Sequence, residues 1–375
     1  MKKAIIIPAS YKGTLSSIEV GDIMAKAVKK VAPDCQITKI PISDGGEGCV
    51  DCFIAAFGGE KITLKTFDPY KKPINSFYGR LTDGTAVIEM ASSAGLPLVK
   101  SNPNPSLTTT YGVGQLIKHA IQHGSKKIII GLGGSCTNDA GVGLAQALGV
   151  EFFDHRCKEF LPTGGTLSEI HFISTDHLMP EVKSVKFTVL CDVKNTFSGP
   201  TGAAHVFAKQ KGADETMIQS LDENLVAFSS LLKTKYGFDT DFEGAGAAGG
   251  TTVSLKLFLN ATIKKGIDTI LDMINFDRLI KDADVIFTGE GKLDKTSFRG
   301  KVIDGIAKHA YAKKIPLIAI CGQIGDIKAN DYPKGLTTAV SLLQKDVSVE
   351  QAIKDTPKNL LLATEKLCRN HVYFS

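Results

Sequence analysis

Acidic and basic side chains recur beside glycines in several short stretches of this 375-residue sequence. Asp44, Asp192 and Asp294 supply carboxylates there, and Lys12 and Lys301 supply positive charge. Phosphoryl transfer needs this combination, because cations neutralise the transferring group, carboxylates hold a divalent metal and backbone N–H groups bind phosphate oxygens. Taken one by one, these residues are equally typical of helix caps or surface ion pairs. Their recurrence favours phosphoryl transfer.

The most informative stretch is residues 128–143, which read IIIGLGGSCTNDAGVG. Three isoleucines predict a short buried strand, and the glycines after it allow a tight turn that approaches a ligand closely. We expect a helix to begin near Asp139, and backbone and side-chain groups ahead of a helix suit phosphate. An ordinary capped strand-to-helix turn is the alternative. The residues that we expect to bind nucleotide here are Gly133, Gly134, Ser135, Thr137, Asn138 and Asp139.

The other polar stretches also follow predicted strands. Apolar runs at 3–8, 35–42 and 62–67 alternate with helical patterns, and this rhythm predicts a parallel, doubly wound sheet with functional groups at the carboxyl ends of its strands. Later strands are expected at 186–190, 283–288, 316–320 and 336–341, and helices at 108–123, 214–236 and 351–368.

The pattern changes after the third strand. Residues 75–81 and 86–90 read as two strands joined across Asp83-Gly84, a pair that favours a hairpin turn. We therefore predict an α/β protein with a discontinuous Rossmann-like domain, residues 1–74 plus 283–375, interrupted by a second α/β domain at 75–282. The active site is expected in the cleft between the two domains, where closure would exclude water.

Composition excludes several classes of protein. The 44 basic and 39 acidic residues give a net charge of +5 without a block of like charge, so a nucleic acid partner is not expected. The sequence begins MKKAIIIP, whose apolar run is too short for a signal peptide, and no stretch is long enough to span a membrane. Eight scattered cysteines indicate reduced thiols, and together these features predict a cytoplasmic protein.

Two further motifs carry less weight. Cys49 and Cys52 form a CxxC pattern, but no second pair or neighbouring histidine completes a zinc set. Gly244, Gly246 and Gly249 satisfy GxGxxG without a preceding strand, which disfavours a dinucleotide site and a dehydrogenase.

Several motifs taken together resemble the bacterial glycerate kinase family. They span nearly the whole chain and occur in the same order as in the family, which makes the resemblance more specific than any single glycine turn. The motifs are PASYKGTLS at 8–16, DGGEG at 44–48, GLGGSCTND at 131–139, CDV at 191–193 with Gly199-Pro200, and GEGKLD at 289–294 with Gly300-Lys301.

The resemblance implies an enzyme that transfers the γ-phosphate of ATP to D-glycerate with Mg²⁺, generally giving 2-phosphoglycerate. Its fold would be a Rossmann-like domain interrupted by a second α/β domain, as inferred above. Three positions depart from the family pattern, with Ala9 in place of an aspartate, Lys194 in place of an aspartate and Thr296 in place of a glutamine.

The residues and the resemblance together give a set of expected roles. Asp192 and Asp294 are expected to hold the metal or orient the glycerate hydroxyl. Arg299 suits a planar carboxylate, whereas lysines suit phosphate oxygens. The expected catalytic residues are Asp192, Asp294, Lys12 and Lys301; the substrate ligands are Ser10, Asp44, Arg299 and Asn195; and the nucleotide ligands include Gly289, Glu290 and Gly291.

Two other functions remain open on the sequence. One is a kinase or phosphatase for another small hydroxy acid, and the other is a non-catalytic protein that binds an anionic metabolite. A homo-oligomer is compatible with the sequence, which does not decide the oligomeric state.

Overall fold

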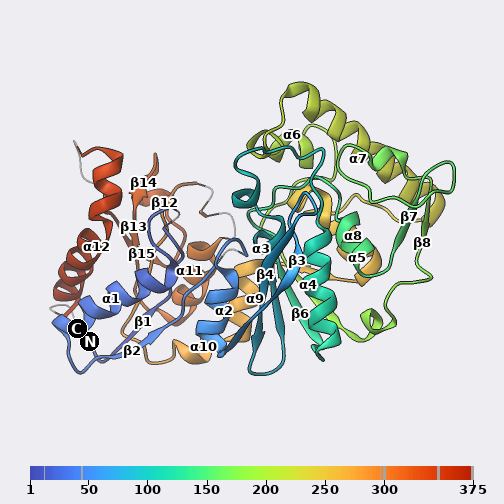
Figure 1. Cartoon of the computed structure of the whole chain (residues 1–375). Coiled ribbons are helices and arrows are strands. Elements are labelled where there is room, and N and C mark those ends of the chain that lie inside the picture. The colour runs from blue at the N-terminus through green and yellow to red at the C-terminus, as the bar shows by residue number, and fades with distance from the viewer. Residues whose placement is uncertain (12, 44, 296, 299–300, 344–346, 373–375) are drawn as a thin grey trace. The chain divides into compact units, whose positions relative to one another are not determined.

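The computed structural model describes residues 1–11, 13–43, 45–295, 297–298, 301–343 and 347–372. The chain divides into two compact units, drawn with their element labels in Figure 1. The first unit contains residues 1–44, 51–58 and 265–375, and the second contains residues 45–50 and 59–264. Each unit is built around its own sheet.

A five-stranded sheet forms the centre of the first unit, and every neighbouring pair in it is parallel. Its strands are short apolar runs: Ala4, Ile5 and Ile6 have no exposed surface although their side chains alternate between the two faces. Both faces are therefore covered, as expected for a doubly wound sheet. The spatial order is β15-β13-β11-β1-β2, with β1 Lys3–Ile6, β2 Gln36–Lys39, β11 Val285–Thr288, β13 Leu317–Cys321 and β15 Leu336–Ser341.

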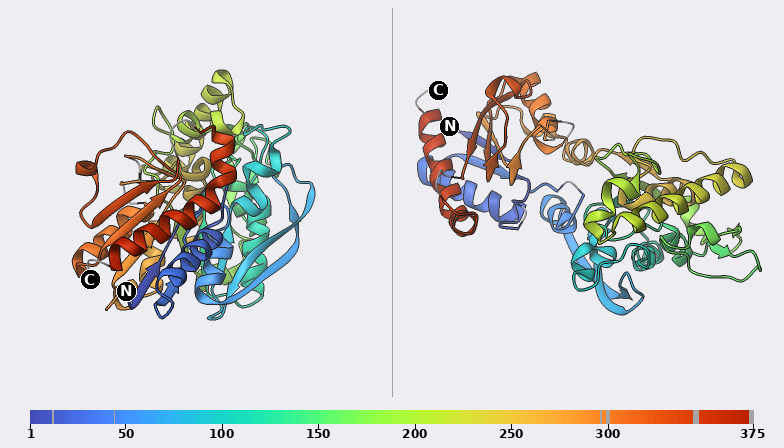
Figure 2. Two further views of the ribbon diagram at one scale, coloured as in Figure 1. Left: turned by 90° about the vertical axis from the view of Figure 1, so that its left-hand side faces the viewer. Right: turned by 90° about the horizontal axis from the view of Figure 1, so that it is seen from above.

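Helices cover this sheet. Ser16 caps helix α1 through a capping box with Glu19, and the buried side chains of α1 include Val20 and Met24. Helices α1 and α12 pack against each other, as Figure 2 shows, while α11 contacts β13 and β15. The elements of this unit outside the sheet are α1 Ser17–Val31, α9 Gly266–Met273, α10 Phe276–Leu279, β12 Lys292–Leu293, α11 Val302–Lys313, β14 Gln323–Ile324, the short 3₁₀ helix η5 Ala329–Asp331 and α12 Val349–Val372; α2 Cys49–Phe57 has residues in both units.

The second unit has a six-stranded mixed sheet in the order β10-β9-β6-β5-β4-β3. Strands β5, β6, β9 and β10 are parallel, and β3 and β4 extend the sheet in antiparallel fashion. The bounds in this sheet are β3 Gly59–Phe67, β4 Pro73–Leu81, β5 Ala86–Glu89, β6 Lys127–Gly131, β9 Lys186–Leu190 and β10 Thr262–Lys264, and a separate pair is formed by β7 Glu151–Phe153 and β8 Phe172–Ser174.

Two apolar clusters hold the second unit together. One joins the sheet to α4 through Val113, Leu116 and Ile117, and the other surrounds α7 through Leu225 and Phe228. The helices are α3 Ala91–Ala94, α4 Tyr111–Gln122, α5 Val142–Ala147, α6 Ala203–Phe207, α7 Glu215–Tyr236 and α8 Ala247–Leu259, and the 3₁₀ turns are η1 Leu96–Val99, η2 Leu167–Glu169, η3 Pro180–Ser184 and η4 Lys209–Lys211.

The structure confirms the mixed α/β class and the parallel sheets, and it changes the predicted boundaries. The hairpin across Asp83-Gly84 is present, with β4 and β5 antiparallel. Strand β3, expected beside the first two strands, instead pairs along its whole length with β4, from Gly59 opposite Leu81 to Phe67 opposite Pro73. The continuous part of the second unit therefore begins at 59 rather than 75, residues 45–50 also belong to that unit, and residues 265–282 belong to the first unit. In the described part of the chain, no helix has the length and apolar character needed to cross a lipid bilayer.

Candidate functional site

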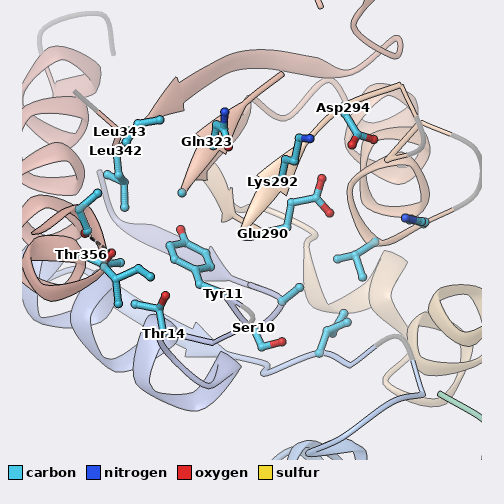
Figure 3. Close-up of a pocket in the computed structure, with 18 of the residues that line it drawn as sticks. Ser10, Tyr11, Thr14, Glu290, Lys292, Asp294, Gln323, Leu342, Leu343 and Thr356 are labelled. Atoms are coloured by element: carbon cyan, nitrogen blue, oxygen red, sulfur yellow. Dashed lines mark hydrogen bonds between the residues drawn. The ribbon is translucent and has the colours of Figure 1, made fainter. Parts of the chain in front are cut away.

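A pocket of about 520 Å³ in the first unit gathers residues from several of the predicted motifs. Its walls come from the segments that follow β1, β11, β13 and β15 and from α12. Figure 3 shows Ser10, Glu290 and Asp294 around this pocket. The predicted site residues that line it are Ser10, Glu290, Gly291, Asp294 and Lys301.

The sheet topology explains why the pocket lies at this edge. In the order β15-β13-β11-β1-β2, the chain leaves β1 for β2 on one side and later adds β11 on the other side. Loops that leave two such neighbouring strands in opposite directions open a crevice at the carboxyl ends of the strands, and ligands bind there in open α/β sheets. Ser10 and Tyr11 follow β1, and Glu290 follows β11, so the pocket occupies this position.

Tyr11 forms part of the pocket wall and fixes its geometry. The phenol is almost fully buried and donates a 2.6 Å hydrogen bond to the carbonyl oxygen of Ile320 at the end of β13. Burial, with Cys321 and Glu290 nearby, raises the pKa of Tyr11 well above its usual value, so the phenol keeps its proton. Gly289 belongs to this contact: a Cβ there would lie 2.1 Å from the Ile320 oxygen and 2.7 Å from the Tyr11 hydroxyl. Gly289 therefore makes room for Tyr11, a packing role that was not predicted for it.

The charged end of the pocket combines a turn and a helix start. Asp294 begins a turn in which its carbonyl accepts from the Ser297 N–H, while the Ser297 hydroxyl accepts from the Asp294 N–H. Lys301 is exposed and occupies the N-cap position of the 12-residue helix α11. The N–H groups at a helix start carry partial positive charge, which adds to the ammonium charge and suits an anion.

Lys12, Asp44 and Arg299 lie outside the described residues, as do Thr296 and Gly300. Their roles stay predictions from the sequence.

The glycine turn in the second unit is shaped by protein packing. A Cβ on Gly131 would lie 2.4 Å from the Gly45 oxygen, and one on Gly133 would lie 2.4 Å from the Gly46 Cα. The Gly133 N–H, expected to face phosphate, donates to the Gly45 carbonyl at 3.0 Å. These glycines allow two glycine segments to touch, whereas Gly134, with φ of +75°, provides the left-handed turn itself. Ser135 is also almost fully buried beside this turn.

The polar side chains after the turn point into the protein interior. Thr137, Asn138 and Asp139 have no exposed surface. The Asp139 carboxylate accepts from the Thr110 N–H at 2.7 Å, from the Thr110 hydroxyl at 2.8 Å and from the Gly141 N–H at 3.2 Å. Burial raises the pKa of Asp139, and these hydrogen bonds oppose the rise. Asp139 thus ties the turn to the start of α4, and its predicted nucleotide contact stays a prediction. The next helix begins at Val142 rather than near 139.

Lys211 also supports this turn, and the sequence did not indicate it. Its side chain is 2% exposed, and its ammonium group donates to the Thr137 carbonyl at 2.6 Å and to the Ser135 hydroxyl at 3.2 Å. Burial lowers the pKa of Lys211 to about 8, against the opposing influence of Cys136 and Asp139. A buried lysine directly under the glycine turn places positive charge next to a predicted anion site.

Asp192 and Asn195 follow β9, as predicted, in a loop that is closed by its own hydrogen bonds. Asp192 is partly exposed, and the Asn195 amide donates to the Thr201 carbonyl at 3.0 Å. Asn195 therefore shapes the loop, and its predicted substrate contact stays a prediction. Because Asp192 and Asp294 belong to different units, the prediction that they act on one metal or hydroxyl stays a prediction.

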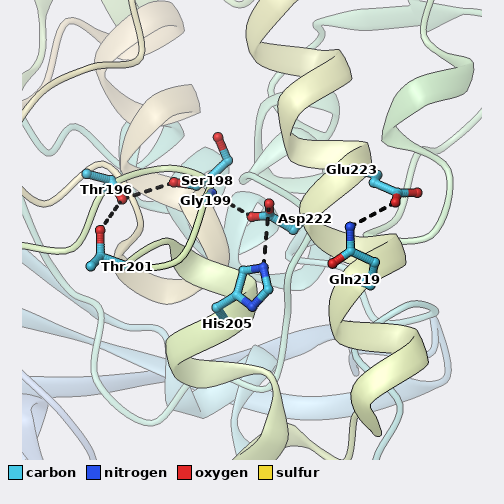
Figure 4. A network of polar contacts seen from close by, with 8 residues as sticks. All are labelled: Thr196, Ser198, Gly199, Thr201, His205, Gln219, Asp222 and Glu223. Carbon is cyan, nitrogen blue, oxygen red and sulfur yellow. Dashed lines mark hydrogen bonds and ion pairs between the residues drawn. The ribbon is translucent and has the colours of Figure 1, made fainter.

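The same loop is anchored to α7 by residues that the sequence analysis did not identify. The buried Asp222 carboxylate accepts from the Gly199 N–H at 2.8 Å and lies 3.7 Å from His205 Nε2, as Figure 4 shows. Asp222 lies beside the buried Leu221 and Leu225 on α7. The sequence did contain a signal for this role of Asp222, because an acidic residue among the apolar positions of an amphipathic helix is expected to be buried with a partner.

The chain is similar over nearly its full length to known glycerate kinases. The profile of the glycerate kinase family matches residues 4–372. A Bacillus subtilis (strain 168) protein named glycerate kinase is 40% identical over 94% of this chain and 93% of its own length. An Escherichia coli (strain K12) protein named glycerate 2-kinase is 37% identical over 97% of both chains.

Its fold is also that of a solved relative. The crystal structure of a Salmonella typhimurium LT2 protein assigned as glycerate kinase 2 has a TM-score of 0.87 and 34% identity to this chain over 98% of both. Together these similarities show that the chain belongs to the glycerate kinase family.

Proposed function

We propose that this protein transfers the γ-phosphate of ATP to D-glycerate and releases 2-phosphoglycerate. The observation that carries the proposal is the pocket of the first unit, where Ser10, Glu290, Asp294 and Lys301 meet at the carboxyl edge of a parallel sheet. Membership of the glycerate kinase family supports ATP and glycerate as substrates. A relative named glycerate 2-kinase supports transfer to the 2-hydroxyl.

The pocket suits a magnesium-dependent reaction. Glu290 and Asp294 both line it, and both are partly exposed. Mg²⁺ is commonly held by one or two carboxylates together with substrate phosphates, and in the described part of the chain no cluster of three or more ligating side chains competes with this arrangement. When bound, the ion would neutralise charge on the phosphates.

The protein's own groups have complementary tasks in this proposal. Lys301 and the first N–H groups of α11 bind phosphate oxygens and offset the charge that accumulates when an anionic acid meets a triphosphate. Lys12, Asp44 and Arg299 bind the substrates, as expected from the sequence. The eight cysteines, seven of them buried thiols, suit work in the cytoplasm.

Product analysis tests the reaction directly. The purified protein is incubated with ATP, Mg²⁺ and D-glycerate, and the product is observed by ³¹P NMR. Phosphorus on the 2-oxygen couples to one carbon-bound proton, whereas phosphorus on the 3-oxygen couples to two. We expect the first pattern. The second pattern would show that the 3-hydroxyl is phosphorylated instead. If ATP were consumed only with a different hydroxy acid, that acid rather than glycerate would be the substrate.

The residue roles are tested by turnover. Asp294→Asn and Lys301→Met are each expected to lower kcat/KM about 100-fold or more, because both remove charge that acts on the phosphoryl group. Lys313→Met is the matched control, because Lys313 is an exposed lysine in the last turn of the same helix α11. If Asp294→Asn and Lys301→Met both kept near-normal turnover, as the Lys313→Met control should, the charged groups that act on the phosphoryl group would have to lie elsewhere.

A further inference from the structure

The pocket in the first unit has two chemically different ends. Figure 3 shows Leu342, Leu343 and Thr356 on one side and Lys292 and Asp294 on the other, with Tyr11 between them. The charged end follows β11, and the apolar end follows β15 and includes the first turns of α12. One ligand that fills this pocket would therefore have an apolar group at one end and a charged group at the other.

The apolar end is held firmly by the main chain. The Leu342 N–H donates to the Cys321 carbonyl at 2.8 Å, and the Leu343 N–H donates to the Gly322 carbonyl at 2.9 Å. These bonds continue the pairing of β13 with β15 beyond the last strand residue. The leucine side chains are thus presented at the sheet edge by a fixed backbone.

Helix α12 leaves apolar surface uncovered at this end. Ile353 lines the pocket with 45% of its surface exposed. The Thr356 hydroxyl donates back to the Ala352 carbonyl at 2.8 Å, so its proton is used within the helix. Both features leave this part of the wall suited to an apolar, flat group rather than to a carboxylate.

The dimensions and polarity of the pocket exclude glycerate as its full occupant. Strands β11 and β15 are separated by β13, which sets their carboxyl ends roughly 10 Å apart. An extended nucleotide bridges such a distance, but a three-carbon acid with an oxygen on every carbon does not, and it would leave the apolar end empty. A pocket of about 520 Å³ is within the range of nucleotide-sized ligands.

We propose that the apolar end, formed by Leu342, Leu343, Ala352 and Ile353, binds the adenine ring of ATP, with the triphosphate directed toward Lys301. This assignment rests on the proposed function for the choice of ATP. Gln323 also lines the pocket and forms no side-chain hydrogen bond within the described residues. Its amide both donates and accepts, which matches the donor and acceptor edge of adenine.

The test compares ATP with inorganic tripolyphosphate, which has the phosphates without the base. Ile353→Asn places a neutral polar group at the apolar end, and Leu362→Asn is the matched control, because Leu362 is a 51% exposed residue of the same helix that does not line the pocket. Dissociation constants are measured by calorimetry with Mg²⁺ and no glycerate. We expect Ile353→Asn to weaken ATP about tenfold and to leave tripolyphosphate within twofold.

Several results would overturn the assignment. Unchanged ATP affinity in Ile353→Asn, equal weakening of ATP and tripolyphosphate, or equal weakening in Leu362→Asn would each place the base elsewhere. A second variant, Gln323→Ala, should weaken ATP at least threefold and leave tripolyphosphate unchanged. Because these measurements contain no glycerate, a protein that binds ATP as expected but does not phosphorylate glycerate would refute the proposed function and leave the adenine site standing.

Discussion

Lys211 provides a quantitative test of how the glycine turn is supported. Its side chain is 2% exposed, and burial lowers its pKa from 10.5 to about 8. Because each pKa unit corresponds to about 1.4 kcal/mol, holding this lysine in its charged form costs the folded protein roughly 3 kcal/mol. Between pH 8 and 10.5 the unfolded chain retains a proton that the folded chain has released. The free energy of unfolding therefore rises with pH across this window.

Replacing the lysine should remove this rise. In Lys211→Met the ionisable group is gone, so the stability of the wild type relative to the variant should increase by about 2 to 3 kcal/mol from pH 7 to pH 10. The difference in unfolding free energy at any single pH also includes the contribution of the hydrogen bonds that Lys211 makes to Ser135 and Thr137. The change with pH isolates the ionisation from these bonds.

The measurement is urea unfolding at several pH values. Far-UV circular dichroism is the suitable signal, because the sequence contains no tryptophan. Lys209→Met is the matched control, since Lys209 lies on the same 3₁₀ turn η4 and its side chain is 78% exposed. The control should differ from the wild type by the same amount at every pH. A pH-independent difference for Lys211→Met as well would refute the depressed pKa and the buried charge inferred from it.

Three further predictions concern positions whose packing is visible in the structure. Gly134→Ala should cost about 1 to 2 kcal/mol of unfolding free energy because of its left-handed φ, whereas Gly133→Ala should cost more because its Cβ meets backbone at 2.4 Å; the reverse ranking in urea unfolding would contradict this. Asp139→Ala leaves the buried Thr110 N–H without its acceptor and should lower the free energy of unfolding by roughly 3 kcal/mol. A decrease below about 1 kcal/mol would indicate that Asp139 is exposed. Tyr11→Phe removes a buried hydrogen bond and should lower thermal stability by about 1 to 2 kcal/mol, a result checked by calorimetry and excluded by an unchanged Tm.

Much of the local structure was predictable from the sequence. Strands β9 and β15 have the predicted bounds, 186–190 and 336–341, because short apolar runs between turn residues have few alternatives to a buried strand. The hairpin across Asp83-Gly84 was predictable for the same reason, since turn chemistry acts over a few residues.

The partners of these elements were not predictable in the same way. Strand β3 alternates exposed and partly buried residues, which is compatible with either sheet, and only its pairing with β4 places it in the second unit. The domain boundary shifts with it. Pairing between strands depends on which surfaces are available after folding, and a single sequence does not encode this in a local pattern.

The candidate site likewise has features that the sequence predicts and features that only the tertiary structure sets. The sequence determined by itself which residues carry charge and that they follow predicted strands, which led to the expectation of functional groups at the carboxyl ends of a parallel sheet. Ser10, Glu290 and Asp294 line one pocket there. Only the tertiary structure decided that Asp139 faces Thr110 and that Gly133 faces Gly46. Glycine and aspartate serve ligand binding and interior packing equally well, because both depend on close approach and hydrogen bonding. The choice between the two is made by residues distant in sequence, such as Lys211, which arrive only when the chain has folded.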